Sequence, residues 1–179
     1  MPFRIPQFSS KRFNMRLMTL ADKDFYIKLH QDPITCQFVG GVLPEEKALQ
    51  EFNFSLRLNR KGSILTFMIT NLIHSNTENT QTQCLIQQPL GLCALVWNKY
   101  RTSVEMGIYL SSEHFGQGIA QEVLAELLSF AFNDLDITNI MIRTEVNNTA
   151  MINTILALPY PLHKTDTEYC WQIDNPLHK

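Results

Sequence analysis

One stretch of the sequence, residues 104 to 132, constrains the fold more than any other. It reads as the end of a β-strand, a short loop that contains Gly116 and Gly118, and an amphipathic helix over 119–132. One face of that helix is apolar, with Val123, Leu124, Leu127, Leu128 and Ala131. A strand that enters a helix through a glycine loop leaves several backbone N–H groups pointing at one spot, at the positive end of the helix dipole. This geometry predicts a site for a pyrophosphate group.

The remaining sequence alternates between strand and helix patterns around this unit. Strands are expected at 13–20, 64–73, 89–97, 102–110, 137–146, 160–163 and 168–173. Helices are expected at 21–31, 34–39, 44–60, 119–132 and 148–158, and Leu49, Phe52 and Leu56 line the inner face of the third of these. The polar segment His74 to Gln88 is predicted to be a long, mobile hairpin connection. The order β-α-α-β-β-β-α-β-α-β-β predicts a mixed sheet with helices on both faces.

Length and charge set the broad class. A chain of 179 residues with 45% hydrophobic residues is sufficient for one well-buried domain, which we expect to span 1–179. A net charge of -2 gives no general attraction to nucleic acid or to an anionic membrane. No apolar run approaches the roughly 20 residues of a membrane span, and the N-terminus lacks the apolar region of a signal peptide. We therefore expect a cytoplasmic protein without nucleic-acid or membrane partners.

The cysteines and histidines do not form a metal motif. Cys36, Cys84, Cys93 and Cys170 include no C-x-x-C pair, and no histidine stands at ligand spacing from them. We expect buried or half-buried free thiols and no metal site.

A dinucleotide-binding Rossmann unit is the main alternative for the glycine loop. The loop, however, comes late in the chain, after three strands in meander order. No acidic residue stands at the usual offset at the end of a following parallel strand. Both observations disfavour this alternative.

The loop resembles motif A of the GNAT acetyltransferases, whose pattern is Arg/Gln-x-x-Gly-x-Gly/Ala. The matching residues are Gly116, Gln117, Gly118 and Ala120, followed by Glu122 at an acidic position of the helix. It is most similar to the branch of the ribosomal-protein N-terminal acetyltransferases (the RimJ and RimL type), in which an aromatic often stands first, as Phe115 does here. The resemblance extends to the segments 16–24 and 145–152, and so to nearly the whole chain.

This resemblance implies an α/β (α+β) fold with a mixed, mostly antiparallel central sheet, splayed central strands and acetyl-coenzyme A as cofactor. The loop would hold the pyrophosphate through the backbone of Phe115, Gly116, Gln117, Gly118, Ile119 and Ala120. Ile108, Tyr109 and Leu110 would pair with the pantetheine arm where their strand splays from 144–146. Asn148 would hydrogen-bond the cofactor, and a plain helix N-cap is the alternative role for this residue.

The same resemblance implies direct attack of a primary amine on the thioester. A base must deprotonate the amine, and a backbone N–H of the splayed strand would stabilise the oxyanion. Glu105 is the first candidate for the base and Glu145 the second; a solvent-facing strand residue is the alternative for either. Met151 and Ile155 stand where the family has a serine and a thiol-protonating tyrosine, and Pro159-Tyr160 replaces the usual Gly-Phe. No general acid is therefore identified.

The acceptor stays open between a protein N-terminus and a small-molecule amine, and a homodimer is compatible with the sequence. A non-catalytic acyl-CoA-binding or regulatory module of the same fold is the rival interpretation, which the missing serine and tyrosine favour. A third interpretation is a structural or interaction domain, which binding of coenzyme A would rule out.

Overall fold

The computed structural model of the chain describes residues 7–72, 88–101, 104–167 and 169–177. Among these residues, eight strands form one sheet in the order β1-β2-β3-β4-β5-β6-β8-β7. The strands are β1 Gln7–Ser9, β2 Phe13–Leu17, β3 Ile64–Asn71, β4 Gly91–Trp97, β5 Val104–Leu110, β6 Asn139–Arg143, β7 Leu162–Lys164 and β8 Cys170–Asp174. Neighbouring strands are antiparallel except β5 and β6, which run parallel. The predicted mixed, mostly antiparallel sheet is confirmed.

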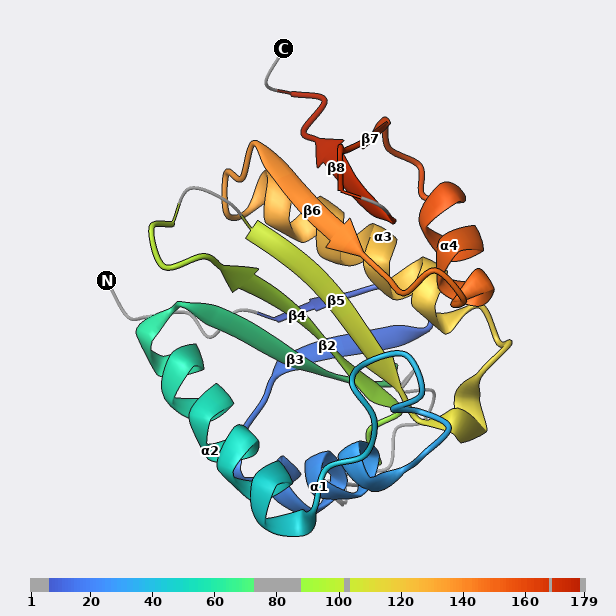
Figure 1. Ribbon diagram of the computed structural model, residues 1–179. Helices are drawn as coiled ribbons and strands as arrows, with labels where there is room; N and C mark the ends of the chain where they lie inside the picture. Colours follow the sequence, from blue (N-terminus) through green and yellow to red (C-terminus); the bar gives the residue numbers. More distant parts are fainter. Residues whose placement is uncertain (1–6, 73–87, 102–103, 168, 178–179) are drawn as a thin grey trace, which may run out of the picture.

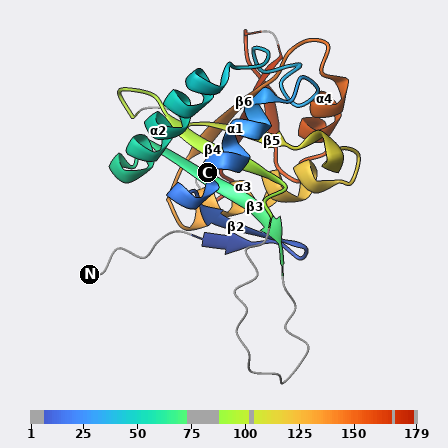
Figure 2. The ribbon, with the colours of Figure 1, turned by 90° about the horizontal axis from the view of Figure 1, so that it is seen from below.

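Helices cover both faces of this sheet. Two of them, α1 Lys23–Gln31 and α2 Glu45–Lys61, pack together on one face, and α3 Ile119–Asn133 crosses the other face with α4 Thr149–Leu156 beside it (Figures 1 and 2). The charges at the ends of α2 suit its helix dipole, because Glu45 and Glu46 lie in the first turn and Arg60 and Lys61 in the last. Gly62 then ends the helix in a left-handed conformation.

The core is divided between the two faces. The larger cluster lies under α3, where all five predicted apolar residues of that helix are buried together with Ile140 and Ile142 of β6. The smaller cluster lies under α1 and α2 and contains Tyr26, Leu29, Phe52, Leu56, Met68 and Leu92. Tyr109 of β5 packs against the smaller cluster, whereas Val104 and Met106 of the same strand belong to the larger one. Alternate side chains of β5 thus face opposite layers.

The predicted helix at 34–39 is wrong, because residues 33–40 form a series of turns. The Asp32 side chain accepts hydrogen bonds from the Ile34 N–H at 3.0 Å and from the Thr35 hydroxyl at 2.7 Å. Such local bonds compete with a helix, and the β-branched residues that follow do not favour one. Gly40 and Gly41 then reverse the chain with positive φ angles of 95° and 82°.

Smaller differences lie at the edges of the sheet and on α2. The three-residue strand β1 was not predicted, because so short a segment carries no periodicity. Leu49 is 36% exposed and Ala48 is buried in its place. Most of the predicted connection His74 to Gln88 lies outside the described residues, as does Cys84. The other three cysteines are free and buried, as predicted. None of the helices in the described ranges has the length and apolar character to cross a membrane.

Candidate active site

Two glycines in a left-handed conformation shape the loop between β5 and α3. Gly116 has φ 72° and Gly118, the N-cap of α3, has φ 71°. A Cβ atom at Gly116 would meet nothing within 4 Å, and at Gly118 the nearest atom is Nη2 of Arg12 at 3.6 Å. Glycine is therefore needed for its backbone conformation rather than for space. The first amides of α3 point out of the helix end, which is the local geometry that an anion-binding loop requires.

The other residues of the loop contribute through their backbone. Phe115 is 48% exposed, and Ile119 is buried in the larger core. The Gln117 side chain turns back and donates from Nε2 to the carbonyl of Glu113 at 3.2 Å. A 3-10 turn over Ser112–His114 leads into this arrangement from β5. The Gln117 side chain thus fixes the loop. The Phe115 N–H is occupied, because it donates to the Ser112 carbonyl at 3.2 Å, whereas Gly116, Gln117 and Gly118 are exposed.

The strand β5 is paired on both sides only at its beginning. Its contact with β4 runs along the whole strand, from Val104 to Leu110. Its parallel contact with β6 is limited to Glu105 and Met106. From Gly107 onward the edge that faces β6 is open, so the two strands splay apart (Figure 1). The main chain of Ile108 faces this open edge. The carbonyl of Tyr109 faces Gly91 of β4 instead. The carbonyl of Leu110 accepts a hydrogen bond from Thr35 at 3.1 Å.

Glu105 lies where the two strands begin to splay. Its carboxylate Oε1 is 2.8 Å from Nε of Arg143 on β6, and the two side chains are 40% and 57% exposed. Because Val104 and Met106 face the larger core, Glu105 faces the layer of α1 and α2. Arg143 was not predicted, because its contact depends on the pairing of two strands that are distant in the sequence.

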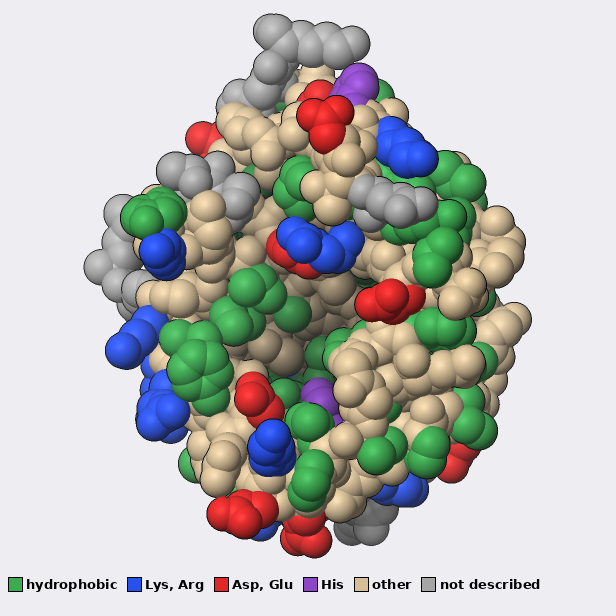
Figure 3. All heavy atoms as spheres, in the orientation of Figure 1, with side chains coloured by type: hydrophobic (Ala, Val, Ile, Leu, Met, Phe, Trp, Pro, Cys, Tyr) green, Lys and Arg blue, Asp and Glu red, His purple; other side chains and the backbone are tan. Residues whose placement is uncertain are grey.

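The face that carries α1 and α2 is hollowed near its centre (Figure 3). On β5, Glu105, Gly107 and Tyr109 all point to this face, and a Cβ atom at Gly107 would meet nothing within 4 Å. The space above Gly107 is therefore open and lies between a carboxylate and an aromatic side chain. Figure 3 shows charged side chains along one rim of the hollow and a histidine at the opposite rim.

Three stacked rings lie on the α1 side of β5. The ring of His30 is 4.1 Å from that of Tyr26 and 5.3 Å from that of Tyr109. Nδ1 of His30 lies 2.9 Å from the carbonyl of Tyr26. Because a carbonyl can only accept a hydrogen bond, the proton of the neutral ring is on Nδ1, and Nε2 carries the lone pair. Burial lowers the pKa of His30 and raises the pKa of Tyr109 to about 12. His30 was not predicted, although Tyr26 and His30 have the i, i+4 spacing of one helix face.

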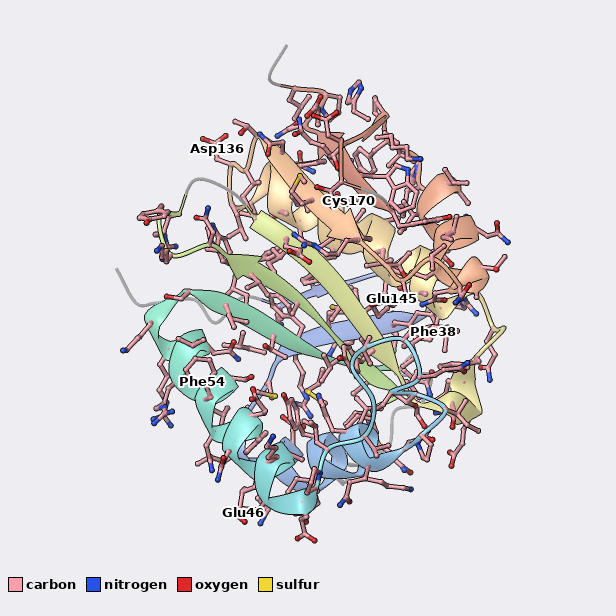
Figure 4. All side chains as sticks on the ribbon, in the orientation of Figure 1. Phe38, Glu46, Phe54, Asp136, Glu145 and Cys170 are labelled. Carbon is pink, nitrogen blue, oxygen red and sulfur yellow. The ribbon has the colours of Figure 1, made fainter. Side chains whose placement is uncertain are left out.

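Glu145 and Asn148 lie beyond the end of β6. Glu145 is exposed, and in the view of Figure 4 it appears near Phe38, which lies on the loop before α2. The carbonyl of Glu145 accepts from the Asn148 N–H at 3.0 Å, while Oδ1 of Asn148 accepts from the Met151 N–H at 3.1 Å. Asn148 is therefore an N-cap of α4, and this role occupies Oδ1 rather than its Nδ2 donor.

The positions that lack the family's serine and tyrosine do not supply a general acid. Ile155 is fully buried in the larger core, and Met151 is half-buried against it. Glu46, one of the acidic residues of α2, lies at the far end of that helix, away from β5 (Figure 4).

The sequence matches the family profile described as an acetyltransferase (GNAT) domain over residues 12–158. A comparison with curated proteins finds no match.

Solved structures share the fold at low sequence identity. An acetyltransferase from Agrobacterium tumefaciens superposes with a TM-score of 0.73 at 18% identity, over 97% of this chain and 95% of that one. Spermidine N-acetyltransferase from Vibrio cholerae, in complex with CoA and spermine, gives 0.70 at 15% identity over 91% and 95%. The ribosomal L7/L12 α-N-protein acetyltransferase RimL, in complex with coenzyme A, gives 0.69 at 16% identity over 94% and 95%.

Proposed function

We propose that this chain, which belongs to the GNAT acetyltransferase family, is an acetyl-coenzyme A-dependent enzyme that acetylates a primary amine. One observation carries the proposal: the open edge of β5 runs directly into a glycine loop at the N-terminus of α3. The amides of an extended arm can pair with an open strand edge, and a pyrophosphate fits a helix N-terminus. Coenzyme A has these two parts in this order.

The described residues fit this cofactor. The amides of residues 116–120 would hold the pyrophosphate, and the main chain of Ile108 would pair with the pantetheine arm. Phe115 and Tyr109 would contribute less than expected, because the Phe115 N–H donates to the Ser112 carbonyl and the Tyr109 carbonyl faces β4. Leu110 would contribute less than the sequence analysis expected, because its carbonyl already accepts from Thr35. Nδ2 of Asn148 is the donor that would reach the cofactor. When bound, acetyl-coenzyme A supplies the activated acyl group as a thioester.

The acceptor amine would enter the hollow above Gly107. We assign Glu105 as the base that removes its proton, with Glu145 as the second candidate. The ion pair with Arg143 contacts Oε1 of Glu105, so Oε2 is the oxygen that we assign to the proton. The acceptors named for two structural relatives, spermidine and the N-terminus of a ribosomal protein, define the two classes to test. Phe115 supports the RimJ and RimL branch. We expect the enzyme to act in the cytoplasm.

The rival function is a non-catalytic acyl-CoA-binding or regulatory module. The buried Ile155 and the half-buried Met151 favour it, because neither side chain can protonate a leaving thiolate. In this case the domain would bind coenzyme A without turnover.

Two measurements test the proposal together. Acetyl-coenzyme A should raise the melting temperature by mass action, because it binds only the folded chain. Thiol release should follow with spermidine, spermine or a peptide with a free N-terminus, but not with the same peptide after N-acetylation. No thermal shift would refute cofactor binding, and a shift without thiol release across the panel would favour the rival function. Size-exclusion chromatography in the same buffer would test for a homodimer.

A further inference from the structure

Arg12, in the turn between β1 and β2, contacts the beginning of α3 with three donors. Its backbone N–H donates to Oε1 of Glu122 at 3.0 Å, and its Nε donates to Oε2 of the same carboxylate at 2.6 Å. Its Nη1 donates to the carbonyl of Gln117 at 3.2 Å. One arginine therefore connects the N-terminal hairpin to the glycine loop and to the first turn of α3.

Folding stability does not account for this arrangement. The side chain of Arg12 is 50% exposed and that of Glu122 is 23% exposed. Ion pairs in contact with solvent contribute little to stability, because water screens them and the side chains lose entropy. We therefore look for a local role of Arg12 at the glycine loop.

The charge of Glu122 opposes the function of the loop. Its carboxylate lies in the first turn of α3, close to the amides that would hold a pyrophosphate. Partial burial raises the pKa of Glu122, but hydrogen bonds from Ser10 and Arg12 outweigh burial and lower the pKa overall. The group is therefore negative at neutral pH and repels phosphate. Arg12 supplies the positive charge that cancels it.

The bond to Gln117 orients the loop. The described part of the chain contains no cis peptide bond, so the carbonyl of Gln117 and the N–H of Gly118 point to opposite sides of one planar unit. When Arg12 holds that carbonyl, the N–H of Gly118 is directed away from the hairpin. Arg12, Gly118 and Glu122 also line one open groove of about 450 Å³, so the guanidinium borders the loop on its solvent side.

We propose that Arg12 is a positioning residue for the coenzyme A pyrophosphate: it neutralises Glu122 and fixes the Gln117–Gly118 peptide. The inference rests on the proposed function. Arg12 acts on the phosphate end of the cofactor and not on the thioester end. Its loss therefore weakens binding of coenzyme A but leaves a phosphate-free donor unaffected.

The test compares two ligands on four proteins. Binding of coenzyme A and of S-acetylpantetheine, which lacks the pyrophosphate and the nucleotide, is measured by calorimetry. The variants are Arg12→Ala, the double variant Arg12→Ala/Glu122→Gln, and Arg57→Ala, which removes the same charge from α2. Arg12→Ala should lower coenzyme A affinity about 10- to 100-fold, the range for loss of a hydrogen bond to a charged group. Its affinity for S-acetylpantetheine and its melting temperature should match those of Arg57→Ala.

The double variant should recover most of the affinity for coenzyme A, because the uncompensated carboxylate has been removed. A merely structural role of Arg12 predicts no recovery, and that result would overturn the electrostatic argument. Equal coenzyme A affinity of Arg12→Ala and Arg57→Ala would overturn the whole inference. If the wild-type chain fails to bind coenzyme A, the proposed function fails instead, and the two failures are thus distinguishable.

Discussion

The two sides of β5 are built in different ways. Along its open edge and the loop that follows, the candidate donor site consists of backbone: strand amides, two left-handed glycines and the first turn of α3. On the face toward α1 and α2, the candidate acceptor site consists of side chains. Glu105, Arg143, His30 and Tyr109 come from three elements that are far apart in the sequence.

This difference has a functional consequence. Backbone amides and glycines suit one invariant ligand, because they offer the same donors whatever the surrounding side chains are. Side chains on a hollow can be exchanged without disturbing the loop, so they suit an acceptor that differs among proteins of one fold. Changes on the donor side should therefore act on acetyl-coenzyme A binding, and changes on the acceptor side on turnover or acceptor affinity.

The largest effect is expected at Gly118. Valine at this position must adopt φ near 71° or move the loop, so Gly118→Val should abolish the rise in melting temperature with acetyl-coenzyme A. Gly62→Val is the matched control, since Gly62 has φ 64° and no atom within 4 Å of an added Cβ but lies at the end of α2. Thermal shift measurements on both variants provide the comparison. A normal shift for Gly118→Val would remove the loop from the donor site.

Next in size is the effect of Glu105→Gln, which keeps the shape but removes the basicity. We expect kcat to fall by about 10²–10⁴-fold with little change in acetyl-coenzyme A affinity. The deficit should shrink at high pH, where the free amine is already neutral. Steady-state kinetics across pH, with Glu145→Gln in parallel, measure this once an acceptor is known. If only Glu145→Gln loses activity, the base is Glu145; if neither variant does, the base is water.

A substitution at Asp22, the N-cap of α1, should lower stability and leave the candidate donor site intact. Asp22, 3% exposed, accepts from Arg16 at 2.6 and 2.9 Å and from the Thr19 N–H at 2.7 Å, which ties the beginning of α1 to β2. Asp22→Asn should cost about 2 kcal/mol of unfolding free energy, as expected for hydrogen bonds to a charged group. Denaturant unfolding measures this loss, and acetyl-coenzyme A affinity should not change.

The same residue predicts a pH dependence. Burial raises the pKa of Asp22, but the hydrogen bonds from Arg16 and Thr19 outweigh it and lower the pKa in the folded chain. A lowered pKa means that the stabilisation is complete above the unfolded value of about 3.9 and is lost as pH falls through the folded value. Wild type should therefore lose stability more steeply than Asp22→Asn in acid. If the unfolding free energies of wild type and Asp22→Asn fell equally steeply with decreasing pH, this assignment would be wrong.

The smallest effect is expected for His30→Phe, which keeps the aromatic stack and removes the ring nitrogens. We expect Nε2 of His30 to accept one neutral hydrogen bond from the acceptor, and its loss predicts a rise in acceptor KM of about 2- to 10-fold. Acetyl-coenzyme A affinity should remain unchanged. The comparison of the two sides would be wrong if the variant weakened binding of acetyl-coenzyme A and left binding of the acceptor unchanged. Initial rates with each substrate varied in turn distinguish these outcomes.

Several features of this protein follow from local sequence alone. The apolar periodicity of α3, the two glycines before it and the alternation in the strands were sufficient to predict most of the element order and a mixed sheet with helices on both faces. The mostly antiparallel pairing was implied by the resemblance to the GNAT family. The prediction failed where side chains act locally against a helix, at 34–39, and where a strand is too short to show a period, at β1. Each success rests on residues within a few positions of one another, whose preferred backbone conformation does not depend on the rest of the chain.

The tertiary structure decided which side chains meet. The contact of Glu105 with Arg143 depends on the register of β5 against β6, and the contact of Arg12 with Glu122 joins residues 110 positions apart. The stacking of His30 on Tyr109 depends on how α1 packs over the sheet. Each contact has a partner distant in the chain, and its geometry is set by strand pairing and core packing. Local sequence therefore predicted the candidate cofactor loop and the candidate base Glu105, whereas the partners of Glu105 on the candidate acceptor side depend on packing.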